Sequence, residues 1–380
     1  MSGPLSHVKV LDLSRVLAGP WSTQMLGDLG ADITKIERPN RGDDTRAWGP
    51  PFITNPDGGE GDAGYFLCTN RNKNTLQIDI TTKDGQEKIR ALAKNADILV
   101  ENYKVGGLKK YGLDYDSLKK INPSLIYCSI TGFGQTGPYA HKAGYDFLIQ
   151  AMSGMMSITG ERDSLPNAGP QKAGIAISDL VTGMYSAIGI LAALAHRNKT
   201  GEGQYIDLAL LDCQMAIQSN QNANYLLSGQ SPQRLGNAHP NIVPYQMMAT
   251  KDSYLILAIG NDHQFRRFCM LVGQEQLADD EKYQNNGARV KNRDKLISLL
   301  ESLIRERTTE DWIRHLEENN IPCGPVNTIE QAFQNPQVIH RNIRRDMTRP
   351  DGTVIPIVAN PINFSKTPVE YNIAPPKLGP

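Results

Sequence analysis

The chain has 380 residues with 40 basic and 40 acidic side chains, so its formal net charge is zero. That length exceeds what one ordinary domain core needs and fits two domains. The balanced charge excludes a global attraction for nucleic acid or for an anionic membrane surface. We find no apolar run close to the ~18 to 20 residues that span a bilayer. We therefore expect no nucleic-acid partner and no membrane partner.

Cysteine and histidine usage favours a reduced, cytoplasmic protein without a metal. The five cysteines are scattered, and none belongs to a Cys-x-x-Cys pair, which argues against a disulfide framework and a zinc site. The seven histidines form no His-x-x-x-His pair, so we expect no catalytic metal. The first residues lack the basic and apolar regions of a signal peptide.

The first 130 residues alternate β-branched runs with helical stretches. The expected strands are 8–13, 32–37, 76–80, 97–100 and 125–130, and the expected helices are 21–29, 83–94 and 116–120. Alternation of this kind predicts a parallel sheet with helices on both faces. The fold class is therefore α/β with a Rossmann-like sheet.

The rest of the chain completes this domain and adds a smaller one. We expect helices at 145–156, 180–197 and 209–227, a linker at 228–232, a strand at 254–259 and helices at 263–272, 292–305 and 309–319. The last segment, rich in strand and loop, is expected to return to the first domain. We assign 1–225 and 331–380 to a large domain, and 226–330 to a small α+β domain.

The sequence does not favour dinucleotide binding, although Rossmann-like sheets often bind dinucleotides. The fingerprint needs Gly-x-Gly-x-x-Gly directly after the first strand, and Leu13–Pro20 lacks two of these glycines. Gly132, Gly134 and Gly137 have the spacing, but Pro138 follows and no apolar helix opens there. A phosphate loop ending in Gly-Lys-Ser/Thr is also missing, so ATP chemistry is unsupported.

Asp179 is the residue that local sequence singles out. It follows an apolar stretch and precedes an apolar helix. One interpretation is a helix N-cap, where Asp is a preferred residue. The other is a nucleophile at a helix N-terminus, where the dipole and free N–H groups stabilise a carboxylate by ~0.3 to 1 kcal/mol. Local chemistry does not choose between the two.

Ordered motifs along nearly the whole chain resemble the family III CoA transferases. The matching segments are Leu11–Pro20, Asp32–Pro39, Asn70–Lys73, Glu101–Tyr103, Gly132–Pro138, the surroundings of Asp179, Arg234–Pro240 with Pro244 and Tyr245, and Pro322–Val326. The resemblance implies a homodimer of interlocked chains, in which each chain threads a ring made by its partner. The stretch Pro375–Pro380 resembles the start of a motif that usually leads into a final helix.

The resemblance also implies a mechanism. The carboxylate of Asp179 attacks the thioester of an acyl-CoA, forms a mixed anhydride and releases CoA thiolate, which later returns to a new acid. Covalent catalysis of this kind divides one hard transfer into easier steps. It needs oxyanion stabilisation and exclusion of water. The coenzyme A thioester is a substrate, its partner is a small carboxylic acid, and no cofactor is permanently bound.

The family pattern assigns a CoA pocket and an acid-binding region by position. The CoA residues are Arg15, Val16, Ala18, Arg38, Asn102, Tyr103 and Lys110. Guanidinium and ammonium groups suit the phosphates of CoA. The substrate or lid residues are Tyr145, Asp146, Arg234, His239, Gly260 and Asn261, with Arg293 as a further candidate for a distal carboxylate.

The acid pair and two other functions stay open. The motifs look closest to transferases for succinate, glutarate or hydroxymethylglutarate, while carnitine-type and short monocarboxylate acceptors remain possible. The lid segment Ala258–Gln264 has one glycine, which departs from the glycine-rich loop of formyl-CoA transferases. An α-methylacyl-CoA racemase would need a His before Asp146, where this chain has Tyr145. A non-catalytic acyl-CoA binding protein is the third alternative.

Overall fold

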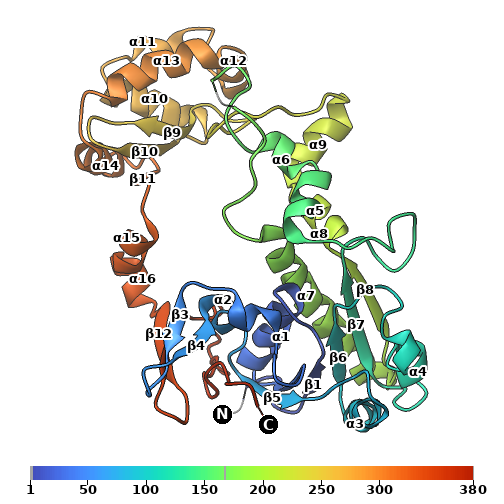
Figure 1. The fold of residues 1–380 in the computed structure, drawn as a ribbon. Helices are drawn as coiled ribbons and strands as arrows, with labels where there is room; N and C mark the ends of the chain where they lie inside the picture. Colours follow the sequence, from blue (N-terminus) through green and yellow to red (C-terminus); the bar gives the residue numbers. More distant parts are fainter. Residues whose placement is uncertain (1–2, 167, 380) are drawn as a thin grey trace. The chain divides into compact units, whose positions relative to one another are not determined.

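A computed structural model describes residues 3–166 and 168–379 (Figure 1). The chain divides into two compact units. The first contains Met1–Met155, Ala173–Gln230 and Pro336–Pro380, and the second contains Met156–Lys172 and Ser231–Asn335.

Residues 156–172 therefore lie in the small unit, whereas the sequence analysis placed them in the large domain. Two arginines explain this difference. Arg162 forms an ion pair with Asp294 at 2.8 Å. The Nε of Arg234 donates to the carbonyl of Glu161 at 3.2 Å.

A six-stranded parallel sheet forms the centre of the first unit. Its order is β5 (Lys73–Gln77), β2 (Asp32–Glu37), β1 (Lys9–Asp12), β6 (Ile98–Glu101), β7 (Ile126–Thr131) and β8 (Tyr205–Ala209). Val10 pairs with Ile33 on one side and with Ile98 on the other. Counted along the chain, this is the doubly wound order, and its switch point lies between β1 and β6. The expected α/β class is confirmed.

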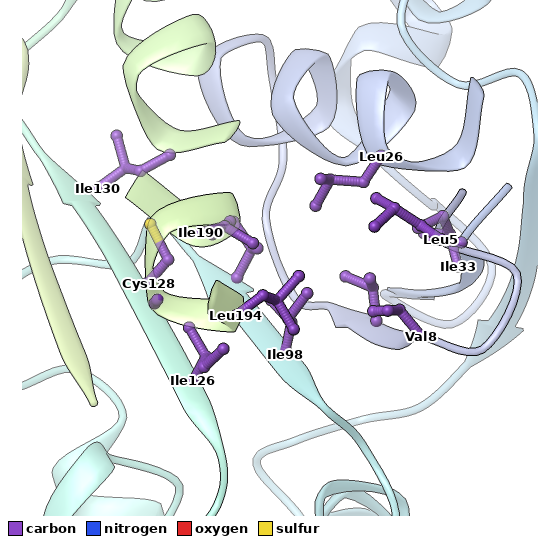
Figure 2. Packing of buried hydrophobic residues seen from close by; sticks show 14 of the residues in the cluster. Leu5, Val8, Leu26, Ile33, Ile98, Ile126, Cys128, Ile130, Ile190 and Leu194 are labelled. Atoms are coloured by element: carbon purple, nitrogen blue, oxygen red, sulfur yellow. The ribbon is translucent and has the colours of Figure 1, made fainter. Parts of the chain in front are cut away.

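Helices cover both faces of this sheet because alternate strand residues point to opposite sides. Helices α1 (Ala18–Asp28) and α7 (Ile177–Thr200) pack on one face, where Leu26 and Ile190 meet strand residues such as Ile98 and Ile126 (Figure 2). Helices α3 (Lys83–Lys94) and α4 (Tyr115–Leu118) pack on the other face, where Ile89 meets a second buried cluster.

Helix α7 differs from the expectation that no apolar run is long enough to span a bilayer. Its 24 residues are long and apolar enough to pass for a membrane span by length and composition alone. In the structure, Ile190, Ala193 and Leu194 of this helix belong to the buried core of the first unit. A core helix of a globular domain has the same composition, so this helix is weak evidence for a membrane.

Several element boundaries differ from the sequence-based prediction. The helix expected at 209–227 is two helices, α8 (Leu210–Ile217) and α9 (Ser219–Ser228), and Ser219, the first residue of α9, has φ 46°. The helix expected at 145–156 is α5 (Asp146–Met152) followed by α6 (Met155–Ile158), and Gly154 at φ 88° separates them. A left-handed residue ends each run of helical hydrogen bonds.

The end of the chain is part of the first unit. The hairpin β12 (Arg344–Thr348) and β13 (Val354–Val358) follows α16 (Pro336–His340), and a second hairpin joins β3 (Phe52–Thr54) to β4 (Glu60–Ala63) ahead of α2 (Gly64–Leu67). Phe66 of α2 shares a buried cluster with Met347 and Ile355. Asp28 accepts hydrogen bonds from Arg71 at 2.6 Å and from Asn360 at 3.0 Å.

The second unit is a small α+β domain, as the fold class expected. Its three-stranded antiparallel sheet has the order β11 (Cys323–Pro325), β10 (Tyr254–Ala258) and β9 (Tyr245–Ala249). Its helices are α10 (Asp262–Leu271), α11 (Gln276–Asp279), α12 (Asn286–Lys291), α13 (Arg293–Ile304), α14 (Thr309–Glu318) and α15 (Ile329–Gln334). Leu257, Phe268 and Leu300 lie in one buried cluster that joins sheet and helices.

Candidate active site

The loops after β1 and β6 meet at the switch point of the sheet. The backbone N–H of Arg15 donates to Oδ1 of Asn102 at 3.0 Å, and Nδ2 of Asn102 donates to the carbonyl of Arg15 at 2.6 Å. Both residues line a cavity of about 510 Å³. Open α/β sheets bind ligands at the carboxyl ends of strands beside a switch point, so this cavity is the candidate site.

The cavity brings together the residues that the family pattern assigned to CoA. Besides Asp179 and Tyr145, its lining includes Arg15, Val16, Ala18, Arg38, Asn102, Tyr103 and Lys110. These side chains come from loops far apart in the sequence. Their assembly in one cavity with Asp179 is the geometry that a nucleophile beside a bound thioester requires.

A buried ion pair fixes the loop after β1. The Nζ of Lys35 lies 3.0 Å from Oδ2 of Asp43, and both side chains are buried. Asp43 accepts a hydrogen bond from the backbone N–H of Val16 at 3.2 Å. Val16 has φ 70°, a conformation that β-branched residues rarely adopt. The hydrogen bond from Val16 to Asp43 holds this conformation at the edge of the cavity.

A second buried pair lies directly behind the same loop. Asp12 accepts from Nζ of Lys73 at 3.2 Å and from Oγ1 of Thr23 at 2.6 Å. Burial acts to raise the pKa of Asp12, but the charges of Lys73 and Lys35 outweigh it and hold that pKa below its usual value. Burial, together with the charge of Lys35, lowers the pKa of Lys73 to about 8. Lys73 belongs to a motif whose role the sequence did not reveal.

Asp179 lies in the first turn of α7, but it is not the N-cap. The N-cap is Ala176, which makes no capping hydrogen bond through its side chain. Asp146, at the start of α5, does the capping instead. Its Oδ1 accepts from the backbone N–H of Ser178 at 2.8 Å and from that of Asp179 at 3.3 Å. The N-cap interpretation of Asp179 is therefore wrong, and its carboxylate is not used for capping.

The environment of Asp179 makes its carboxylate basic. Burial raises its pKa to about 7, and the charge of Asp146 adds to this effect. Among the residues that the structure describes, none donates a hydrogen bond to this carboxylate. Tyr65 is a neighbour, since burial and the charge of Asp179 raise its pKa to about 12. A carboxylate that is poorly solvated and unpaired is a stronger nucleophile than one in water.

The cavity lining has five cations, Arg15, Arg38, Lys104, Lys110 and Lys142, against four carboxylates, Glu37, Asp44, Asp79 and Asp179. Two of these carboxylates are paired, Glu37 with Arg46 at 2.7 Å and Asp44 with Arg15 at 3.0 Å. The arrangement suits a ligand with several phosphate groups.

The remaining predicted residues belong to the second unit, and two of them have structural partners there. Arg234 forms an ion pair with Asp163, and its Nε bonds to Glu161. Arg293 donates to the carbonyls of His239 at 2.8 Å and Pro240 at 2.9 Å. The guanidinium groups of Arg234 and Arg293 therefore already hold segments of their own unit.

His239, Gly260 and Asn261 also have partners within the second unit. The Nδ1 of His239 accepts from the backbone N–H of Asn241 at 3.1 Å. Asn261 is the N-cap of α10, where its Oδ1 accepts from the N–H of Gln264 at 2.9 Å. The N–H of Gly260 donates to the side chain of Gln264 at 2.8 Å. Gln264 thus holds Gly260 and Asn261, which precede α10, at the start of this helix.

Comparison with known proteins decides the family. The model of CoA-transferase family III matches residues 5–380. The chain belongs to this family. A succinate–glutarate CoA-transferase from Agrobacterium fabrum is 53% identical over 99% of this chain and 93% of that protein. The human succinyl-CoA:glutarate CoA-transferase is 42% identical over 99% of this chain and 84% of that protein.

Solved structures agree with the family assignment. A CaiB/BaiF family protein from Brucella suis has a TM-score of 0.87 and 49% identity, covering 100% of this chain and 97% of that one. The protein Rv3272 from Mycobacterium tuberculosis has a TM-score of 0.85 and 26% identity, with the same coverage. The chain is thus a CoA transferase with the fold of its family.

Sequence reasoning missed several residues of the CoA transferase cavity. Lys104, Lys142 and Trp48 line it, and Trp48 contacts Tyr65 edge to face at 5.3 Å. Lys142 lies in the turn-rich segment before Tyr145, and its Nζ lies 3.7 Å from the centre of the Tyr139 ring. The proximity of Lys142 to the Tyr145–Asp146 motif was the available signal. Nothing in the sequence around Trp48, apart from its residue type, indicated that it would line the cavity.

Proposed function

We propose that this CoA transferase exchanges CoA between dicarboxylic acids, with succinate and glutarate as the pair to test first. The proposal is supported by the relative from Agrobacterium fabrum, a succinate–glutarate CoA-transferase at 53% identity, and by the mouse succinyl-CoA:glutarate CoA-transferase at 43%. The observation that carries the mechanism is the basic, unpaired carboxylate of Asp179 in the cationic cavity.

In the proposed mechanism Asp179 reacts in its ionised form. One carboxylate oxygen attacks the thioester carbonyl, the carbon–sulfur bond breaks, and CoA leaves as the thiolate. The acyl group remains on Asp179 as a mixed anhydride. The thiolate then attacks the aspartyl carbonyl, which releases the donor acid and leaves an aspartyl thioester of CoA.

The acceptor acid repeats these steps in reverse. Its carboxylate attacks the aspartyl thioester, which gives a second anhydride and frees the thiolate again. The thiolate attacks the acyl carbonyl, which forms the new acyl-CoA and regenerates the Asp179 carboxylate. The atoms and charges of these steps balance without an oxidant, a reductant or a net change in protons. Each thioester exchanges for another, so the reaction is close to thermoneutral.

Within this proposal the cations of the cavity bind the phosphate groups of CoA. Arg38 and Lys110 come from loops on either side of the switch point, and Lys104 and Lys142 add to them. The lysines bind as point charges, whereas Arg38 offers a planar fork of donors. The acyl end of the ligand is then placed toward Asp179, Tyr145 and Trp48.

We also propose that two copies of the chain form a homodimer in the cytoplasm. Helix α7 exposes Met184, Ile188 and Leu191, at spacings of four and three residues, which place them on one helix face. The adjacent α5 exposes Phe147 and Leu148. Large apolar side chains exposed on neighbouring helices are typical of a protein interface. Light scattering after gel filtration tests the dimer, and Ile188→Glu is expected to weaken it.

The first experiment traps the covalent intermediate. The intact protein is mixed with succinyl-CoA and hydroxylamine and analysed by mass spectrometry beside Asp179→Asn. A hydroxamate on Asp179 in the parent alone supports the mechanism. Labelled glutarate then tests the acid pair, because glutaryl-CoA forms only if the acceptor is accepted. If neither succinyl-CoA nor other acyl-CoA donors give an adduct, Asp179 is not the nucleophile.

A further inference from the structure

Glu101 is a buried carboxyl group that the proposed mechanism does not use. It ends β6, beside the loop that carries Asn102 and Tyr103, and only 6% of its surface is exposed. Its Oε2 accepts from the backbone N–H of Tyr103 at 2.7 Å. Its Oε1 accepts a short hydrogen bond from Oγ of Ser129 on β7. Among the described residues, no cation forms an ion pair with it.

These hydrogen bonds connect Glu101 to a second loop of the cavity. The Nε2 of Gln135 donates to Oγ of Ser129 at 2.8 Å, so Glu101 is linked through Ser129 to the segment after β7. Thr131, the last residue of β7, and Gly132, the first residue after it, line the cavity, as does Tyr103. One carboxyl group therefore holds the loops after two neighbouring strands.

A third loop is reached through the residue next to Glu101. Asn102 exchanges two hydrogen bonds with the backbone of Arg15, in the loop after β1. Any shift of the chain at Glu101 moves Asn102 and hence this contact. The three loops that depend on Glu101 carry Arg15, Val16, Tyr103 and Lys110 of the cavity lining.

The surroundings of Glu101 disfavour its charge. Burial raises its pKa to about 7, although the hydrogen bonds from Ser129 and Tyr103 act against this. The titratable groups that face it are Tyr103 on the following loop, Tyr127 and Cys128 on β7 and Tyr205 on β8. None of these groups is a cation, so ionised Glu101 gains stability only if the loops around it open to water.

We propose that Glu101 is a positioning residue for the acyl-CoA pocket, whose neutral carboxyl group keeps the three loops in the form that binds CoA. Ionisation of Glu101 loosens these loops, so CoA affinity falls as the pH rises through neutrality. The inference rests on the proposed CoA site. It assigns no chemical step to Glu101, because the residue is absent from the cavity lining.

The test measures equilibrium binding of CoA by calorimetry at pH 6 and pH 8. All proteins carry Asp179→Asn, so that the titration of Asp179 does not enter. Glu101→Ala is expected to bind CoA about tenfold more weakly at pH 6, as the loss of a buried acceptor predicts. Glu101→Gln keeps an acceptor for Tyr103, and its amide N–H replaces the O–H that the protonated carboxyl group offers to Oγ of Ser129, which then accepts instead of donating. This variant is expected to bind CoA within about twofold of its parent at pH 6.

The pH dependence separates positioning from a general loss of structure. The parent is expected to lose affinity between pH 6 and pH 8 relative to Glu101→Gln, whose side chain does not ionise. The titration of the CoA phosphates is the same for both proteins and cancels in the comparison. In protein with Asp179 intact, Glu101→Gln is expected to leave kcat unchanged. Its KM for acyl-CoA is expected to rise less between pH 6 and pH 8 than the KM of the parent.

Control variants distinguish failure of the inference from failure of the CoA site. Arg38→Ala and Lys110→Ala are expected to weaken CoA binding at both pH values. If they do not, the CoA site itself is misplaced. If they do, but Glu101→Ala and Glu101→Gln match the parent at both pH values, the positioning role is overturned. Should Glu101→Ala not fold, the pH dependence of Glu101→Gln decides alone.

Discussion

Asp146 caps the helix that carries Asp179. Its Oδ1 accepts from the backbone N–H of Asp179 at 3.3 Å and from that of Ser178 at 2.8 Å. The capping carboxylate also raises the pKa of Asp179, as a second cause after burial. One residue thus fixes the position of the proposed nucleophile and increases its basicity.

Replacing Asp146 by Asn separates these two effects. The amide oxygen still accepts from the helix, but the negative charge is gone, so the pKa of Asp179 is expected to fall. The acid limb of the kcat/KM profile moves to lower pH by roughly half a unit to one unit. A pH-rate profile checks this, with Asp116→Asn, an exposed carboxylate paired to Lys119, as control. An unchanged limb would show that Asp146 acts only as a cap.

The raised pKa of Asp179 makes its ionisation costly for the folded state. The unfolded chain loses this proton near the model value of 3.8, and the folded chain near 7. The folded state therefore binds more protons between these values, and its stability falls as the pH rises through that window. Asp179→Asn is expected to be more stable than the parent at pH 8, by roughly 1 to 3 kcal/mol.

Urea unfolding at pH 5 and pH 8 measures this gain. Protonated Asp179 resembles Asn, so the gain is expected to shrink at pH 5. A gain of equal size at both pH values would mean that the substitution acts through packing rather than through charge. A gain that is larger at pH 8 would show that the ionised carboxylate of the proposed nucleophile destabilises the fold.

Lys142 is expected to contribute to acyl-CoA binding, although the sequence analysis missed it. Lys142→Ala removes one cation from the cavity lining and is expected to raise KM for acyl-CoA several-fold, with kcat within about twofold of the parent. Lys119→Ala removes a cation outside the lining and serves as the matched control. Steady-state kinetics at two salt concentrations test this, because the effect of Lys142 weakens with added salt. Equal KM values in all three proteins would exclude the contact.

Lys73 is expected to be essential for stability, because it is the buried partner of Asp12. Lys73→Met leaves the carboxylate of Asp12 without its ion pair, and removal of one member of a buried pair costs about 3 to 5 kcal/mol. Thermal unfolding checks this beside Lys88→Met, which breaks an exposed helix pair with Asp84 and is expected to have no measurable effect. Similar melting temperatures for the two variants would contradict the buried role.

The parallel sheet was predictable because its signal is local. Buried strands and the helices between them leave alternating patterns in the sequence, and most boundaries agree within a few residues. The break at Ser219 was not predictable, since no Gly or Pro marks it. The capping of α7 by Asp146 was also hidden, because that hydrogen bond joins residues more than thirty positions apart. The dimer, the cytoplasmic location and the site roles stay predictions, whereas the division into units differs from the predicted domains at Met156–Lys172.

Some of the predicted site residues line the cavity, whereas others have structural roles elsewhere. The family pattern supplied the seven CoA residues and Asp179, which one cavity collects. It also supplied Arg234 and Arg293 as candidates for a distal carboxylate, and the structure instead gives their guanidinium groups partners within the second unit. A surface cation and a structural one look alike in sequence, because only the folded chain shows which carbonyls lie within reach.

The discontinuous first unit constrains the order in which a nascent chain acquires its structure. Asp28 accepts from Asn360, and Phe66 shares its cluster with Met347 and Ile355. A ribosome delivers every residue of the second unit before these late partners emerge. The second unit can therefore complete its own core while Phe66 of α2 in the first unit still lacks its buried partners Met347 and Ile355. That cluster is completed only after the segment that follows the second unit has been made.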